Sequence, residues 1–159
     1  MLPEHAVVAD LGAGTGFYSV AMGKLLPRGK VYAVEVQKDY LSKIRHKVRE
    51  AHLSNIEPIW GNVEKLHGTK IHDAVTDAVI ATDVLFQVED KPGFIAETKR
   101  ILKPGGKVLL IDWVTPIHGR LEHTVPRAKA QEMFESAGFA QEREIDVGAR
   151  HYGMILKKL

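Results

Sequence analysis

A chain of 159 residues with 45% hydrophobic and 26% charged residues has the composition of one globular domain, residues 1–159, and not of a disordered chain. Its 22 basic and 20 acidic residues leave a net charge of only +2, so composition does not predict nucleic-acid binding. The lack of cysteine excludes disulfides, cysteine-ligated zinc and a thiolate nucleophile, and it fits a cytoplasmic location.

The first predicted element is a short apolar run that begins at Val7 and ends in an acid, a glycine-rich turn and residues at helical spacing. This order predicts a strand, a tight loop and a helix. Glycines let the backbone approach a ligand, so loop amides can face a polar group. Glycines 12, 14 and 16 form GxGxG, whereas the dinucleotide fingerprint would place its third glycine at Phe17. The loop predicts nucleotide binding of another kind, with an ordinary turn as the alternative.

A second apolar strand is predicted over Lys30–Glu35, after a helix that proline and glycine end near residues 26–29. Its last residue, Glu35, is an acid about 20 residues beyond the glycine loop, where a carboxylate can accept hydrogen bonds from ribose hydroxyls. An acid that only ends a strand is the alternative.

With these two elements the sequence resembles the class I S-adenosylmethionine-dependent methyltransferases. Residues 10–16 match the family's DxGxGxG signature, Glu35 matches its ribose acid, and residues 102–106 match the turn before its fifth strand. The resemblance extends from about residue 7 to residue 157. It implies a Rossmann-like, doubly wound α/β fold with a seven-stranded sheet, mostly parallel with an antiparallel last strand, and S-adenosylmethionine as cofactor. Family members usually carry N-terminal helices over the cofactor, which the lead-in of residues 1–6 does not provide.

The resemblance also assigns cofactor-binding roles by position. Asp10 would orient the loop and help hold the charged amino acid part of the cofactor, Glu35 would bind the ribose, and Thr82 would border the methionine end. Val36 and Val63 would enclose the purine, and Asn62, at a position where the family commonly has an acid, would accept from the adenine amine through its amide oxygen. The loop itself would pass beneath the cofactor at Gly12, Ala13, Gly14 and Gly16.

The middle of the chain alternates helices and strands. Spacings of three and four predict an amphipathic helix over residues 38–52, whose basic residues we interpret as a solvated face. A third strand is predicted over residues 55–60, and a polar connector over residues 67–76 leads to a fourth strand over residues 77–81. The loop at residues 82–90 lacks the D/N-P-P-Y/F run of base-amine methyltransferases and is closer to quinone-biosynthesis enzymes. Asp83 in this loop is a candidate catalytic residue or a structural one.

A helix over residues 91–102, a turn and a fifth strand over residues 107–113 follow. Residues 114–126 interrupt the alternation of helices and strands with prolines and a glycine, so we expect a substrate-facing loop there. His118 and His123 in this loop are candidate general bases. No spacing of acids and histidines predicts a metal site. A helix over residues 128–138, a sixth strand over residues 139–147 and a strand over residues 151–157 complete five strand–helix crossovers and a terminal antiparallel hairpin.

We expect a methyltransferase with an unidentified, small-molecule methyl acceptor. One alternative is an RNA methyltransferase, because residues 29–35 look like a stretch of fibrillarin-type enzymes. Another is a non-catalytic, cofactor-binding partner subunit. A homodimer or a partner subunit would cover an exposed apolar rim. No apolar run approaches the ~20 residues that span a bilayer, so no membrane partner is expected.

Overall fold

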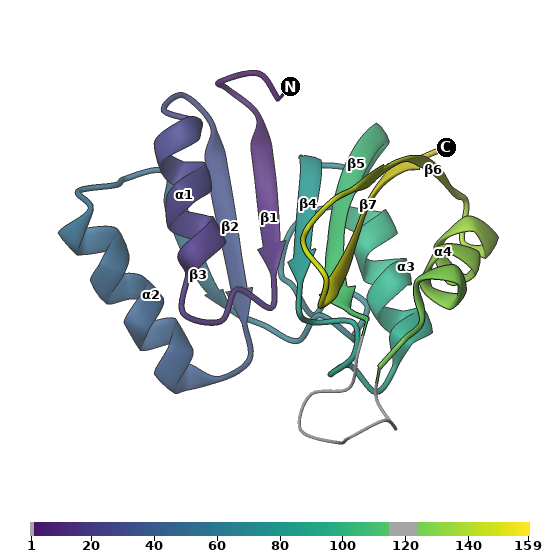
Figure 1. Ribbon diagram of the computed structural model, residues 1–159. Coiled ribbons are helices and arrows are strands. Elements are labelled where there is room, and N and C mark those ends of the chain that lie inside the picture. The colour runs from purple at the N-terminus through teal and green to yellow at the C-terminus, as the bar shows by residue number, and fades with distance from the viewer. Residues whose placement is uncertain (1, 115–123) are drawn as a thin grey trace.

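The protein forms one seven-stranded sheet in the order β3-β2-β1-β4-β5-β7-β6, with helices on both faces (Figure 1). The computed structural model describes residues 2–114 and 124–159. Strand β7 runs antiparallel to its neighbours β5 and β6, and the other pairs are parallel, which confirms the predicted fold class. The elements are β1 (Val7–Leu11), α1 (Phe17–Leu25), β2 (Lys30–Glu35), α2 (Lys38–Glu50), β3 (Ile56–Trp60), β4 (Thr76–Thr82), α3 (Lys91–Ile101), β5 (Leu102–Trp113), α4 (Arg127–Ser136), β6 (Phe139–Ile145) and β7 (His151–Lys158).

Strand β4 shows why its sequence is an uninterrupted apolar run. Ala78 and Ile80 belong to a cluster that includes Met22 of α1, whereas Val79 and Ala81 belong to the cluster of Phe94 in α3. Because alternate residues of a strand point to opposite faces, both faces of β4 are buried and both select apolar residues.

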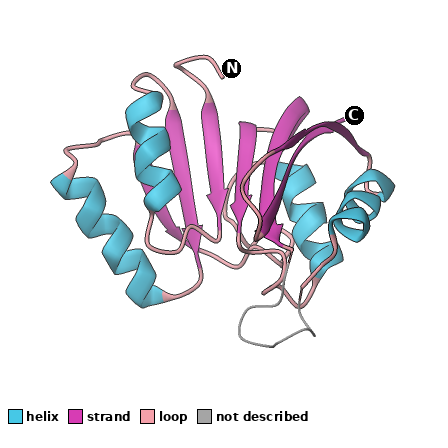
Figure 2. Ribbon diagram, in the orientation of Figure 1, coloured by secondary structure: helices cyan, strands magenta, loops and turns pink. Residues whose placement is uncertain are grey.

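The strand order reverses between β1 and β4, at the centre of the sheet. From β1 the chain winds outward through β2 to β3, and from β4 it winds the other way to β5. Figure 2 shows α1 and α2 on one side of the molecule and α3 and α4 on the other. Loops that leave the carboxyl ends of β1 and β4 therefore diverge and open a crevice, which is where ligands bind in such sheets.

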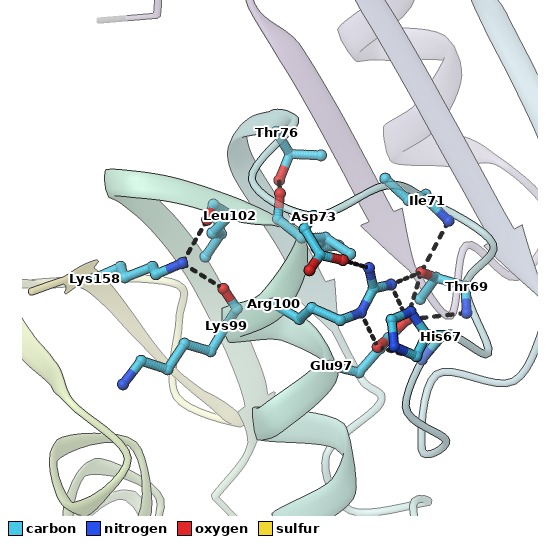
Figure 3. A network of polar contacts seen from close by, with 11 residues as sticks. His67, Thr69, Ile71, Asp73, Thr76, Glu97, Lys99, Arg100, Leu102 and Lys158 are labelled. Carbon is cyan, nitrogen blue, oxygen red and sulfur yellow. Dashed lines mark hydrogen bonds and ion pairs between the residues drawn. The ribbon is translucent and has the colours of Figure 1, made fainter.

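The connection from β3 to β4 contains no helix, in agreement with the polar connector predicted there, so four of the five predicted crossovers carry a helix. The buried carboxylate of Glu97 in α3 orders this segment instead, by accepting hydrogen bonds from the backbone of His67 and from Thr69 (Figure 3). Arg100 donates two more hydrogen bonds to the same carboxylate. Burial alone would raise the pKa of Glu97, but the hydrogen bonds from Arg100 and Thr69 outweigh it and lower the pKa to about 2.

Strand β5 begins earlier than predicted. Leu102 already pairs with Thr76, but the next paired residue of β5 is Lys107, opposite Ala78. The intervening residues 103–106, which we expected to be a turn before the strand, form an irregularity within it, with Gly105 at φ 74°. None of the helices in the described part of the chain is long and apolar enough to cross a membrane.

Candidate functional site

A cavity of about 360 Å³ opens at the carboxyl ends of the central strands. Its walls come from the loops after β1, β2, β3 and β4, so the crevice at the strand-order reversal is the site of the cavity. This volume lies in the range of small-molecule sites. The cavity brings together seven of the predicted site residues, namely Gly12, Gly14, Glu35, Val36, Asn62, Val63 and Asp83.

The glycine loop adopts backbone angles that suit glycine. Gly12 has φ 75°, and a Cβ there would lie 2.7 Å from Cγ2 of Val84 in the loop after β4. Gly14 has φ 54°, lines the cavity, and its Cβ would meet no atom within 4 Å. A side chain at Gly14 would therefore occupy open space at the cavity wall, which is the space that a ligand lying on the loop needs.

Asp10 supports the loop from below and does not line the cavity. Its carboxylate is buried and accepts a hydrogen bond of 2.5 Å from the Ser19 hydroxyl in α1. Burial raises the pKa of Asp10 to about 6, the hydrogen bond from Ser19 opposes that rise, and the charge of Glu35 adds to it. Asp10 thus connects β1 to α1 across the loop.

Glu35 connects the first two strand ends. Its Oε2 accepts the backbone N–H of Gly14 at 2.9 Å, and its Oε1 accepts the backbone N–H of Gln37 at 2.9 Å. A carboxylate offers about four acceptor positions, so two remain for ligand hydroxyls. The two backbone bonds fix the orientation of the carboxylate before any ligand is bound.

The loop after β3 is folded around Asn62. Its amide oxygen accepts the backbone N–H of Glu64 at 2.8 Å, which is an Asx turn. The oxygen that we expected to face adenine therefore already has one partner and keeps a second acceptor position. Glu64 in turn accepts the backbone N–H of Glu89 at 2.7 Å, which connects the loops after β3 and β4 across the cavity.

The described lining of the cavity is acidic. It contains four carboxylates and no lysine or arginine, although the whole chain carries a net charge of +2. Such a surface favours a cationic ligand and disfavours phosphates. The carboxylates belong to Glu35, Glu64, Asp83 and Glu89.

Asp83 is the first residue after β4 and pairs with a residue that sequence reasoning missed. Its Oδ1 lies 3.2 Å from Nε2 of His151, the first residue of β7. The two atoms are at ion-pair distance, but Oδ1 has no aligned hydrogen bond. Burial raises the pKa of Asp83, and His151 opposes this rise. His151 reaches the carboxyl edge of the sheet because β7 is antiparallel, so that its first residue lies beside Trp113 at the end of β5.

Asp112 holds the loop that follows Asp83. This buried carboxylate on β5 accepts the backbone N–H of Phe86 at 3.1 Å and of Trp113 at 2.8 Å. Burial raises the pKa of Asp112 to about 6, against these backbone hydrogen bonds, and the charge of Asp83 adds to the rise. Asp112 therefore fixes the backbone of the loop after β4, which forms one wall of the cavity.

The remaining predicted residues lie outside the cavity lining. Ala13 packs among the α2 core residues, and Gly16, at φ 82°, begins α1, where a Cβ would come within 3.1 Å of Ile44. Thr82 ends β4 without lining the cavity. His118 and His123 lie outside the described residues, which contain no cluster of three or more potential metal ligands.

Sequence reasoning missed several lining residues that have no motif of their own. Gln37 is the N-cap residue of α2 and Tyr40 lies in its first turn. Both follow Glu35 closely in the sequence, and this short separation was the available signal. Glu64, Gln87 and Glu89 lie in loops whose conformation depends on contacts between distant segments.

Comparison with known proteins places this geometry among methyltransferases. A family model described as a methyltransferase domain matches residues 2–151. The demethylmenaquinone methyltransferase of Listeria welshimeri is 29% identical over 189 aligned positions, which cover 95% of this chain and 79% of that protein.

Solved structures show the same fold. A SAM-dependent methyltransferase from Aquifex aeolicus superimposes with a TM-score of 0.86 at 25% identity, covering 97% of this chain and 82% of that one. The methyltransferase from Haloferax volcanii in complex with its Trm112 activator superimposes with a TM-score of 0.82 at 18% identity, covering 98% and 84%.

Proposed function

Because this chain belongs to the class I S-adenosylmethionine-dependent methyltransferase family and is an enzyme that methylates a small molecule, we propose that its acceptor is a quinone-like ring in the reduced, dihydroxy form. The name of the Listeria welshimeri relative supports a quinone ring. A quinone is electron-poor, whereas its dihydroxy form carries an electron-rich ring carbon, so the reduced form is the one that can attack an electrophilic methyl group.

The acidic lining of the cavity carries this proposal. Bound S-adenosylmethionine supplies an electrophilic methyl group on a positively charged sulfur. Four carboxylates without an opposing lysine or arginine in the described lining favour that cation and a neutral acceptor. The same charges repel the phosphates of RNA and of dinucleotides, so they argue against an RNA acceptor.

We infer the following binding roles. The loop at Gly12 and Gly14 passes beneath the cofactor, and the two free acceptor positions of Glu35 bind the ribose hydroxyls. Val36 and Val63 enclose the purine, and the second acceptor position of Asn62 faces the adenine amine. Asp10, Ala13 and Gly16 shape the loop from beneath, and Thr82 borders the methionine end.

Calorimetric titration tests the cofactor roles. We expect S-adenosylmethionine and S-adenosylhomocysteine to bind and NAD not to bind. Glu35→Gln should lower the affinity for S-adenosylmethionine and for S-adenosylhomocysteine by roughly tenfold or more, because hydrogen bonds to the ribose are lost. Glu57→Gln is the matched control, because Glu57 on β3 pairs with Lys30 on β2 and does not line the cavity. Equal affinities for the wild type and the two variants would contradict the assigned role of Glu35.

We also propose that a second copy or a partner subunit covers the apolar rim of the site, in a cytoplasmic enzyme. Phe17 at the start of α1, Val36 after β2 and Trp60 at the end of β3 are 71%, 55% and 50% exposed, all near one edge of the sheet. Exposed large apolar side chains at the rim of a site are typical of an interface. The Haloferax volcanii neighbour with an activator chain offers a precedent for a partner. Sedimentation at roughly 50 µM should show a dimer, and a monomer there would exclude self-association.

A further inference from the structure

We propose that Asp83, positioned by His151, is the base that receives the proton of the methyl acceptor. The inference rests on the proposed function and adds a catalytic role for Asp83 and a positioning role for His151. It starts from the ion pair between Asp83 Oδ1 and His151 Nε2 at the edge of the cavity.

The backbone of Asp83 is held in an unusual conformation. Its φ is 54°, in the left-handed region, which costs energy for a residue other than glycine and which Asp and Asn tolerate best. Its N–H donates to the carbonyl of Ile111 in β5, and its carbonyl accepts from Nε2 of Gln87. These bonds direct the carboxyl group toward the point where β4, β5 and β7 meet.

The two oxygens of the carboxylate have different surroundings. Oδ1 is buried against His151, yet the Asp83 side chain as a whole is 47% exposed and lines the cavity. The exposed surface therefore belongs to the rest of the group, which includes Oδ2. One oxygen lies at ion-pair distance from the imidazole, and the other is left to face a ligand.

The imidazole of His151 is itself fixed. Its ring centroid lies 4.1 Å from that of Trp113, the residue opposite it in the β5–β7 register, and its side chain is only 23% exposed. The ring cannot turn away from Asp83 without losing this stacking. The pair is thus preorganised, whereas exposed surface ion pairs are not.

Two unsatisfied polar atoms belong to this arrangement. In the described part of the chain five buried side-chain polar atoms lack a hydrogen-bond partner, and they include Oδ1 of Asp83 and Nε1 of Trp113. Trp113 is the residue against which His151 packs. Buried polar groups are normally satisfied, so unsatisfied ones around the pair favour a functional role over a purely structural one.

The charges around Asp83 fit a proton acceptor. Among the described residues, His151 on β7 faces it with a potential positive charge, while Asp112 on β5 and the cavity residues Glu64 and Glu89 carry negative charge. Burial favours the protonated form of Asp83, and His151 favours the ionised form that must be present before transfer.

The proposed step balances without a further reactant. The electron pair of the acceptor atom forms the bond to the methyl carbon, the bond between that carbon and sulfur breaks, and its electrons return to sulfur. The proton released by the acceptor binds Oδ2 of Asp83 and later leaves to solvent. An acceptor that holds its proton tightly, such as a hydroxyl or an aromatic ring carbon, needs such a base.

The test compares Asp83→Asn and His151→Phe with a matched pair elsewhere. Asn keeps the shape and the tolerance of positive φ, and Phe keeps the stacking on Trp113. The control is His46→Phe, because His46 Nε2 lies 3.2 Å from Glu50 in an exposed pair on α2, the same distance as in the proposed pair. Thermal unfolding verifies that each variant folds.

With reduced demethylmenaquinone as the acceptor probe, Asp83→Asn should lower kcat by roughly 100-fold or more. His151→Phe should lower kcat and move the acid limb of the rate profile to higher pH, since loss of His151 lets the Asp83 pKa rise. His46→Phe should change neither. An unshifted acid limb in His151→Phe, or near-normal kcat in Asp83→Asn, would overturn the assignment.

A second measurement does not depend on the acceptor. Sinefungin carries a protonated amine where the reactive methyl group would be, so its affinity relative to S-adenosylhomocysteine reports a carboxylate near the transfer point. Asp83→Asn should reduce the affinity for sinefungin by roughly tenfold and leave that for S-adenosylhomocysteine within about twofold. Equal losses would overturn the placement of Asp83. If wild-type enzyme binds both analogues but does not methylate the quinol, the acceptor proposal fails while this comparison still tests Asp83.

Discussion

The backbone N–H of Gly14 donates to the carboxylate of Glu35 at 2.9 Å, so the glycine loop and the acid that ends β2 are one hydrogen-bonded unit. The two groups are 21 residues apart in sequence and come together because β1 and β2 are adjacent parallel strands. The carboxylate thereby fixes the backbone of the loop and keeps two further acceptor positions. This relationship explains why both motifs occur together in the sequence.

Gly14→Ala should block the cavity. The substitution places a methyl group in open space at the cavity wall and forces φ 54° on alanine. We expect a loss of about 1–2 kcal/mol in unfolding free energy and a decrease of at least roughly tenfold in S-adenosylmethionine affinity.

Gly148→Ala is the control for Gly14→Ala, because it strains the backbone without placing a methyl group in the cavity. Gly148, in the β6–β7 turn away from the cavity, has φ 85°, and a Cβ added there would likewise meet no atom within 4 Å. Urea unfolding should give a comparable loss of stability, and calorimetry an unchanged affinity. If both variants bind S-adenosylmethionine equally well, the glycine loop does not carry the cofactor.

Glu89→Gln should reduce discrimination between cofactor and product. S-adenosylmethionine carries a net positive charge and S-adenosylhomocysteine none, so the acidic lining favours the former. Removal of one carboxylate should weaken S-adenosylmethionine by roughly two- to fivefold and leave the product nearly unchanged. Calorimetry at low and high salt measures both, with exposed Glu132→Gln in α4 as the control. An equal effect on both ligands would refute the electrostatic account.

Glu97→Gln should destabilise the fold through the connector between β3 and β4. The amide would present N–H groups to donors on His67 or Thr69 and would remove the buried charged partner of Arg100, which would keep only its ion pair with the exposed Asp73. Loss of one member of a buried pair typically costs about 3–5 kcal/mol. Urea unfolding near neutral pH measures the change, and a loss below about 1 kcal/mol would show that the network is not structural.

Asp10→Asn should change the pH dependence of stability in a defined direction. Burial raises the Asp10 pKa from 3.8 to about 6, so the unfolded chain ionises first as pH rises through this window. Folding then loses stability between about pH 4 and pH 6, and the loss persists above it. Asn titrates in neither state and can still accept from Ser19.

The stability of Asp10→Asn relative to wild type should therefore be greater at about pH 7 than at about pH 4, by roughly 2–3 kcal/mol. Urea unfolding at the two pH values measures this difference directly. A constant difference between the two proteins would mean that the Asp10 carboxyl titrates normally.

The sequence predicted what depends on local pattern. Apolar runs with glycine and proline boundaries located the strands, and the spacing from Gly14 to Glu35 located one end of the site. The polar connector between β3 and β4 was predicted, but not the side chain from α3 that orders it. No local pattern signals that Glu97 reaches Thr69, which lies 28 residues away.

His151 shows a second limit. Functional residues are expected after the carboxyl ends of parallel strands, but an antiparallel strand brings its first residue to that edge. No single segment of the sequence predicts the order of β5, β7 and β6 in the sheet. Likewise, the turn that occupies the amide oxygen of Asn62 depends on the local path of the backbone.

The proposed acceptor is tested directly by transfer of an isotope-labelled methyl group from S-adenosylmethionine to reduced demethylmenaquinone, read by mass spectrometry of the quinone. We predict one labelled methyl group per product ring with wild-type protein, and at least roughly 100-fold slower transfer with Asp83→Asn. Tight binding of S-adenosylmethionine without any labelled quinone would contradict the proposed acceptor, and label transferred to RNA by the same protein would replace it.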